Sequence, residues 1–204
     1  IAVLTTAAAA FAQGWEAGAA AGFGANRHSA VTGPAGSARA GFAVAPAFGV
    51  YVSQDVSSRL GGEIRYTYSA GDLSLRSGET KVTFGGESHL AHYDLLVYAA
   101  PQGANIRPFF ALGAGARLTR GTGQESAYQP LMQHALLTRT RQVQAIASLG
   151  AGLKMKVGER MMFRAEFRDY VSAFPMKVIA PAGGAKINGW LHDIVPLVGL
   201  GWIF

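Results

Sequence analysis

The chain has 204 residues, of which 50% are hydrophobic and 15% charged, with a formal net charge of +6. This composition is too apolar and too poor in charge for a disordered or coiled-coil protein. Glycine is abundant, at 27 residues, but follows no three-residue period, which excludes collagen. Cysteine is absent, which excludes disulfides, thiolate metal sites and cysteine nucleophiles.

The first residues have the pattern of an export signal. Residues 1–12 are apolar and end in Ala10-Phe11-Ala12, a small-x-small pattern typical of a signal-peptidase site. We predict that residues 1–12 are the C-terminal part of a signal peptide and that residues 13–204 form one domain. No stretch is long and apolar enough to predict a transmembrane helix.

From residue 14 onward, apolar residues alternate with small or polar ones, which predicts strands with one apolar face. The alternating windows are 8 to 14 residues long, and a tilted strand needs about 9 to 11 residues to cross a bilayer. The windows are eight in number: 15–25, 40–52, 60–70, 92–99, 110–118, 143–156, 163–170 and 194–204. In the clearest case, Val143, Leu149 and Leu153 share one face while Ser148 and Lys154 share the other.

The connections between these windows alternate in length, as they do in outer-membrane barrels. The short ones lie near residues 53–58, 101–105 and 158–160, and the long ones cover 28–37, 71–88, 121–141 and 172–192. An even strand count places both chain ends at the periplasmic side. If residues 73–84 formed an extra hairpin in the wall, the barrel would have ten strands. Aromatic girdles are expected at both rims, with Phe48 at the periplasmic rim and Phe42 at the outer rim.

In a bilayer, strands must close into a barrel so that every backbone polar group is paired. The interior of an eight-stranded barrel is just wide enough for side chains to fill it. Charges in such a space must be paired, because an unpaired buried charge is costly. We therefore predict a lumen charge network of four acids and five bases: Glu16, Glu63, Arg65, Asp94, Arg117, Lys154, Arg164, Glu166 and Arg168.

Several motifs resemble those of the small OmpA/OmpX type of bacterial outer-membrane β-barrel protein. They are Arg107-Pro108-Phe109-Phe110-Ala111-Leu112-Gly113-Ala114-Gly115, Gly150-Ala151-Gly152-Leu153-Lys154, Arg164-Ala165-Glu166-Phe167-Arg168-Asp169-Tyr170 and the terminal Gly199-Leu200-Gly201-Trp202-Ile203-Phe204. The resemblance implies an all-β, closed, antiparallel up-and-down transmembrane barrel in the bacterial outer membrane. It also implies that Trp202 and Phe204 are recognised by the barrel-assembly machinery.

The surroundings of such a barrel suggest its partners. Outer-membrane lipid would contact its wall, and cations near the outer rim would pair with lipopolysaccharide phosphates. The candidate cations are Arg27, Arg39, Arg120, Arg139, Arg141, Lys177 and Lys186. We expect no nucleic-acid partner, because the basic residues are not interleaved with aromatic ones. We expect the protein to be a monomer.

We expect no catalytic, metal or cofactor site. His89 and His92 are three residues apart and so point to opposite faces of a strand, where they cannot share a metal. His92 and Asp94 share a face and would form an acid/base pair, but no serine lies at a spacing that identifies a nucleophile.

We therefore predict a structural or surface-interaction role, carried by long extracellular loops above a plugged, charged lumen. The alternatives are a narrow passive pore for ions or small solutes, and a lipid A-modifying enzyme. Within the loops, residues 124–138 are predicted to form a short helix over the barrel mouth.

Overall fold

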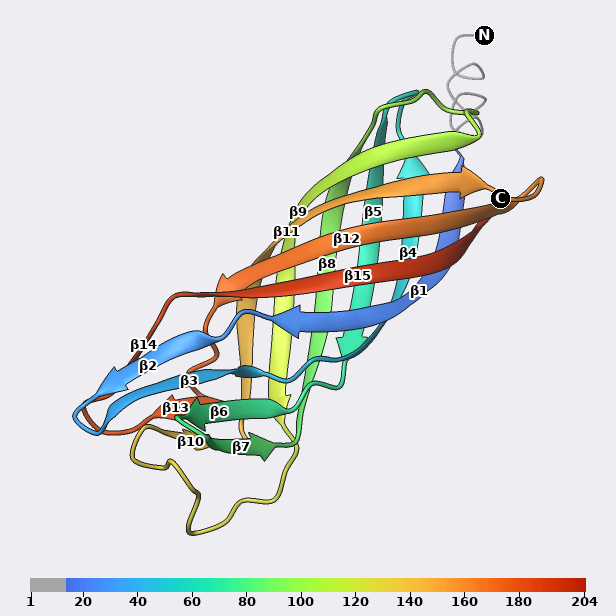
Figure 1. Cartoon of the computed structure of the whole chain (residues 1–204). Coiled ribbons are helices and arrows are strands. Elements are labelled where there is room, and N and C mark those ends of the chain that lie inside the picture. Colours follow the sequence, from blue (N-terminus) through green and yellow to red (C-terminus); the bar gives the residue numbers. More distant parts are fainter. Residues whose placement is uncertain (1–13) are drawn as a thin grey trace, which may run out of the picture.

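The computed structural model of the chain describes residues 14–204, so the predicted signal segment lies outside the described residues. Eight strands form a closed antiparallel barrel in the order β1-β15-β12-β11-β9-β8-β5-β4 (Figure 1). The predicted eight-stranded, all-β barrel is confirmed. Its strands are β1 (Trp15–Asn26), β4 (Ala45–Asp55), β5 (Leu60–Ser69), β8 (Gly86–Tyr98), β9 (Ile106–Gly121), β11 (Arg141–Lys156), β12 (Met161–Ala173) and β15 (Trp190–Ile203). In the part of the chain that is described, no helix is long and apolar enough to span a membrane.

The two ends of the barrel differ. Both ends of the described chain lie at one end, together with short turns, and we call this the short-turn end (Figure 1). The four longer connections emerge at the opposite end, the long-loop end. Strand β1 pairs with β15 on one side and with β4 on the other, so that Ala17 lies between Trp202 and Val52. This double pairing closes the sheet.

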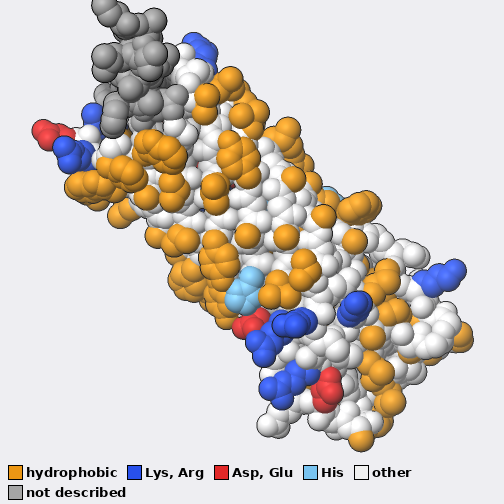
Figure 2. Space-filling view, turned by 180° about the vertical axis from the view of Figure 1, so that it is seen from behind, with side chains coloured by type: hydrophobic (Ala, Val, Ile, Leu, Met, Phe, Trp, Pro, Cys, Tyr) orange, Lys and Arg blue, Asp and Glu red, His pale blue; other side chains and the backbone are white. Residues whose placement is uncertain are grey.

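Side chains alternate across the barrel wall as a sheet requires. On the outside, Ile64, Phe110 and Val143 are each about two-thirds exposed, at 67%, 68% and 67%. Their sequence neighbours Glu63, Phe109 and Gln144 point inward and are buried. Apolar side chains therefore cover much of the outer wall, as Figure 2 shows in orange. An apolar surface of this extent marks a protein that contacts lipid or another protein.

The long connections are folded rather than loose. Strands β14 (Lys186–Asn188), β2 (Ser29–Gly33), β3 (Gly36–Phe42), β6 (Leu73–Ser77) and β7 (Thr80–Phe84) form one sheet, and β10 (Ala135–Leu137) pairs with β13 (Ile179–Pro181). The two sheets share an apolar core beyond the barrel, the loop core, which includes Val31, Leu73, Leu75, Leu137, Val178 and Ile179. The hairpin considered at residues 73–84 does form, but it belongs to this outer sheet, so the ten-stranded alternative is wrong.

The predicted helix over residues 124–138 is also wrong. This segment makes turns and ends in β10, and Leu131 has a φ of 66°, which is incompatible with a continuous helix. The side chain of Gln129 takes the place of backbone hydrogen bonds that a helix would form. Its amide nitrogen donates to the carbonyl of Leu137 at 2.9 Å, and its amide oxygen accepts from the Leu137 backbone amide at 3.0 Å. Amphipathic spacing alone does not reveal this local competition.

Two aromatic residues lie away from their predicted girdles. Residues 43–44 interrupt the strand between β3 and β4, so the alternation does not continue across them. Phe42 is consequently buried in the loop core instead of facing outward at the rim. Phe48 faces outward, but it pairs with Tyr68 in the half of β4 nearer the long-loop end, away from the periplasmic rim where it was expected.

Candidate functional site

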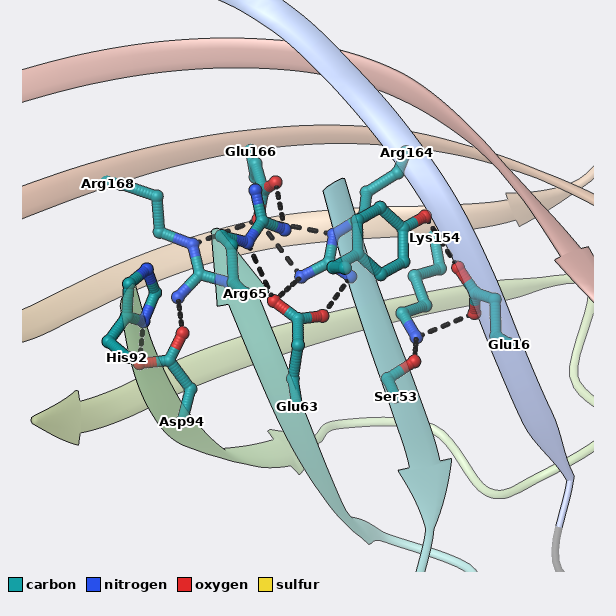
Figure 3. Close-up of polar contacts among 11 residues, drawn as sticks. Glu16, Ser53, Glu63, Arg65, His92, Asp94, Lys154, Arg164, Glu166 and Arg168 are labelled. Atoms are coloured by element: carbon teal, nitrogen blue, oxygen red, sulfur yellow. Dashed lines mark hydrogen bonds and ion pairs between the residues drawn. The ribbon is translucent and has the colours of Figure 1, made fainter. Parts of the chain in front are cut away.

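The centre of the lumen is occupied by one carboxylate facing three guanidinium groups (Figure 3). Glu63 on β5 accepts hydrogen bonds from both terminal nitrogens of Arg164 on β12. It also accepts one from Arg65 Nε at 2.9 Å and one from Arg168 Nη2 at 3.0 Å. Strands β5 and β12 are four positions apart in the ring of eight, so the Arg164–Glu63 pair crosses the barrel from wall to wall.

Two further carboxylates balance these three cations. Glu166 Oε2 accepts from Arg164 Nη2 and Arg168 Nε, each at 3.0 Å. Its other oxygen lies 2.7 Å from Arg65 Nη2, an ion pair that lacks hydrogen-bond geometry. Asp94 on β8 accepts from Arg168 Nη1. The group is therefore neutral, with three guanidinium groups and three carboxylates, all with side chains at most 1% exposed.

A second group lies nearer the short-turn end. Lys154 on β11 donates to Glu16 Oε2 on β1 at 2.8 Å and to Ser53 Oγ on β4 at 3.4 Å. The hydroxyl of Tyr51 donates to the other Glu16 oxygen at 2.7 Å. Tyr51 also links the two groups, because the Arg164 guanidinium lies 4.6 Å from its ring centroid. Such a cation–π contact favours the charged guanidinium.

The ninth predicted residue, Arg117, is separate from these groups. It donates to Asp193 at 2.6 Å nearer the long-loop end. At the short-turn end, Arg107 pairs with Asp55 at 2.7 Å and lies 3.7 Å from the Tyr98 ring centroid. Asp193, Arg107, Asp55 and Tyr51 were absent from the predicted network. All four have the inward parity of their strands, so alternation was the signal that could have identified them.

Apolar layers lie on either side of the central charges. Leu96, Tyr98, Phe109 and Ala111 pack together towards the short-turn end. Leu90, Ile146, Val195 and Leu197 belong to a second layer. At the long-loop end the inward residues Thr119 and Ser172 are fully buried, since the loop core lies beyond them. Salt bridges in such enclosed surroundings hold the opposite walls of the barrel together.

The lumen also contains an imidazole that pairs with an acid. His92 Nδ1 lies 3.2 Å from Asp94 Oδ1, and the ring packs against Tyr170 with 5.1 Å between centroids. Both residues are buried, as is Ser148, whose hydroxyl is on the same buried side of the wall. Within residues 14–204, no three His, Asp or Glu side chains gather in a way that could hold a metal ion.

The predicted rim cations divide into separate places. Arg120, Arg139, Arg141 and Lys177 line one groove of about 820 Å³ at the long-loop end, which we call the rim groove. Figure 2 shows blue side chains gathered where the orange wall ends. Glu87 in this groove lies 3.5 Å from Arg120 and 3.8 Å from His89. Arg39 lies elsewhere, on the outer sheet, and Arg27 and Lys186 lie outside the groove.

The two aromatic residues of the proposed assembly signal lie at the short-turn end and face outward. Trp202 pairs with Ala17 and Met161 and is half exposed, while Phe204 is exposed next to Trp15, whose carbonyl accepts from the Phe204 amide at 3.0 Å. Both are therefore accessible on the outer wall of the finished barrel.

A closed eight-stranded barrel with an apolar outer wall and a neutralised, charged interior defines an integral outer-membrane β-barrel protein. The sequence profile described as "Outer membrane protein beta-barrel domain" matches residues 1–204. The chain belongs to this family of bacterial outer-membrane proteins. A search of curated protein sequences finds no significant match.

Solved structures support the fold. The outer-membrane protein OprG from Pseudomonas aeruginosa superimposes with a TM-score of 0.61 at 12% identity, covering 93% of this chain and 95% of that one. Neisserial surface protein A gives a TM-score of 0.55 at 11% identity, covering 94% and 97%. At these identities the likeness concerns the fold alone.

Proposed function

We propose that this protein is a non-conducting outer-membrane barrel that presents a folded, cationic loop region at the cell surface. The observation that carries the proposal is the cross-lumen pairing of Arg164 with Glu63, since these side chains occupy the axis of the barrel. The apolar layers and the loop core add further obstacles to solutes. The long-loop end then provides the interacting surface.

Planar-bilayer recording tests the closed lumen. The purified protein, inserted from detergent, is expected to give no stable conductance steps above the membrane leak. The double variant Glu63→Gln, Arg164→Met serves as a comparison. It removes the ion pair that crosses the lumen, and neither of the two charges is left without its partner. Stable open levels in the unaltered protein would contradict the proposal and favour the passive-pore alternative.

We further propose that the rim groove holds the phosphates of lipopolysaccharide. It brings Arg120, Arg139, Arg141 and Lys177 together just beyond the apolar wall, the level of lipid headgroups. Glu87 neutralises part of this charge through Arg120, and Glu125 accepts from the backbone amide of Arg139 at 2.6 Å. Among the described residues, the charged side-chain groups of Arg139, Arg141 and Lys177 form no ion pair. Guanidinium groups are well suited to bidentate phosphate binding.

Co-purification tests this partner. The triple variant Arg139→Gln, Arg141→Gln and Lys177→Gln is expected to carry less lipopolysaccharide than the unaltered protein after extraction. A control variant at the short-turn end, Lys156→Gln with Arg160→Gln, keeps the loops intact and is expected to carry the normal amount. Equal loss in both variants would contradict a specific groove.

We propose that the protein acts without catalysing a reaction. In support, the His92–Asp94 pair is enclosed in the lumen, where a lipid substrate has no route to it. Mass spectrometry of lipid A from cells with and without the protein is expected to give the same species. A protein-dependent loss or gain of an acyl chain would instead favour the lipid A-modifying enzyme.

A further inference from the structure

The outer sheet has three cations in a single row across three neighbouring strands. Arg39 on β3 lies directly opposite Arg76 on β6, and Arg76 lies directly opposite Lys81 on β7. All three are exposed on the face of the sheet that points away from the loop core. We call this set the cationic row. Like charges placed opposite each other across strands destabilise a sheet.

The sheet itself does not compensate this repulsion. None of the three side chains lies within ion-pairing distance of a carboxylate in residues 14–204. Arg76 Nε instead donates a hydrogen bond to the carbonyl of Gly78 at 3.2 Å. His28 lies on the same face of the sheet, next to Gly41. The pKa of His28 is lowered by its own partial burial and by the nearby positive charges of Lys81 and Arg39. The row is therefore a positive surface whose three charges form no direct ion pair among the described residues.

The row also borders a concavity. A groove of about 500 Å³ is lined by Arg39 and Arg76 together with Ala30, Ser37, Ala38, Ser77 and Gly78. Its small side chains leave room between the two guanidinium groups, and its serines add polar atoms. Adjacent strands are separated by about 4.8 Å, so the three charges span roughly 10 Å. A single small anion would leave part of this span unmatched.

We propose that the cationic row binds a saccharide chain that carries several sulfate or phosphate esters. Ester oxyanions match the bidentate geometry of the guanidinium groups, and a chain carries the repeated charges that the row requires. Such groups occur on the phosphorylated core sugars of lipopolysaccharide and on sulfated polysaccharides of a contacting surface. This site is distinct from the rim groove and does not depend on it.

The test uses the full chain in lipid nanodiscs that contain no lipopolysaccharide, titrated with dextran sulfate at fixed ionic strength. Replacing both arginines, Arg39→Gln with Arg76→Gln, removes charge-assisted bonds and is expected to weaken binding by about tenfold or more. The matched short-turn variant, Lys156→Gln with Arg160→Gln, should bind as the unaltered protein does. The rim variant, Arg139→Gln with Arg141→Gln, should also bind dextran sulfate as the unaltered protein does. This result would distinguish binding at the cationic row from binding in the rim groove.

A second measurement excludes a purely structural explanation. Because removing Arg76 relieves the repulsion from both neighbours, Arg76→Gln is expected to shift the urea midpoint of the loop region upward while weakening binding. A titration with delipidated, phosphorylated core oligosaccharide then distinguishes the two saccharide classes. Binding of either saccharide supports the proposal, and the one that binds more tightly identifies the preferred ester, sulfate or phosphate. Unchanged binding in the double variant, or equal binding of single-stranded DNA, would overturn it.

Discussion

Arg164 and Glu63 face each other across the full width of the lumen, from strands that are four positions apart in the ring of eight. Both side chains are fully buried, and 101 sequence positions separate them. The pair thus fixes the distance between opposite walls. It is also the centre from which Arg65 and Arg168 are neutralised, because both contact the same carboxylate.

Neutralising Glu63 should be strongly destabilising. In Glu63→Gln, three guanidinium groups lose a shared anion, and breaking a buried pair in this way costs about 3–5 kcal/mol. Urea unfolding in detergent micelles, followed by tryptophan fluorescence, measures the change. Glu159→Gln, in an exposed short turn, is the control and should be nearly neutral. A loss of less than about 1 kcal/mol for Glu63→Gln would contradict a dry network.

The pair of Glu16 and Lys154 should behave as a coupled unit. Either Glu16→Gln or Lys154→Met leaves the other charge buried, whereas the double variant removes both charges. The double variant is therefore expected to be more stable than the sum of the single changes predicts, with a coupling energy of about 1–3 kcal/mol. A double-mutant cycle on unfolding free energies provides the measurement, and additive effects would show that water screens the pair.

The outer wall should penalise charge according to depth. Leu112 lies in a row with Leu149 and Leu95 near the middle of the wall, while Ile106 lies on the same face at the short-turn end. In lipid vesicles, Leu112→Arg should lose about 2–4 kcal/mol of folding free energy and Ile106→Arg about 1 or less. Equal costs at the two depths would be inconsistent with a membrane-spanning wall.

The loop core should be separable from the barrel. Leu75 is buried in it, and Leu75→Ala is expected to destabilise the core locally by about 2–5 kcal/mol. Trypsin should then cleave faster at Arg39, Arg76 and Lys81, while the barrel keeps its folded mobility in SDS gels without boiling. Val82→Ala, at a partly buried position, is the milder comparison. Loss of the folded barrel band in Leu75→Ala would show that the two parts unfold together.

Much of the barrel could be predicted because alternation is a local signal. The inward parity of Glu63, Arg65 and Glu166 is visible within each strand, and so is the apolar parity of Leu149. The ion-pair partners of such inward residues could not be predicted from the sequence. Arg117 and Asp193 are 76 positions apart and pair only because the closed ring brings β9 and β15 to face each other across the lumen.

The loop region was harder to predict, because small local breaks reset the pattern. The two irregular residues after Phe42 interrupt the alternation, so the Phe42 side chain points inward and not outward as expected. In residues 124–138, the Gln129 side chain stabilises turns where the spacing of apolar residues favoured a helix. The cationic row depends in turn on the register between three strands. Since Arg39 and Arg76 are far apart in sequence, only the pairing of β3 with β6 reveals that they are opposed.

Cysteine accessibility along β11 tests the central claim most directly, since the natural chain has no cysteine. Single variants Leu149→Cys and Ser148→Cys place adjacent thiols on opposite faces of the wall, the first partly exposed and the second fully buried. In detergent micelles at alkaline pH, where a thiol on the outer wall can ionise, a membrane-soluble maleimide should label Leu149→Cys slowly, and Ser148→Cys only after unfolding. Rapid labelling of Ser148→Cys in the folded barrel, with protection of Leu149→Cys, would contradict an apolar wall around a filled, charged lumen.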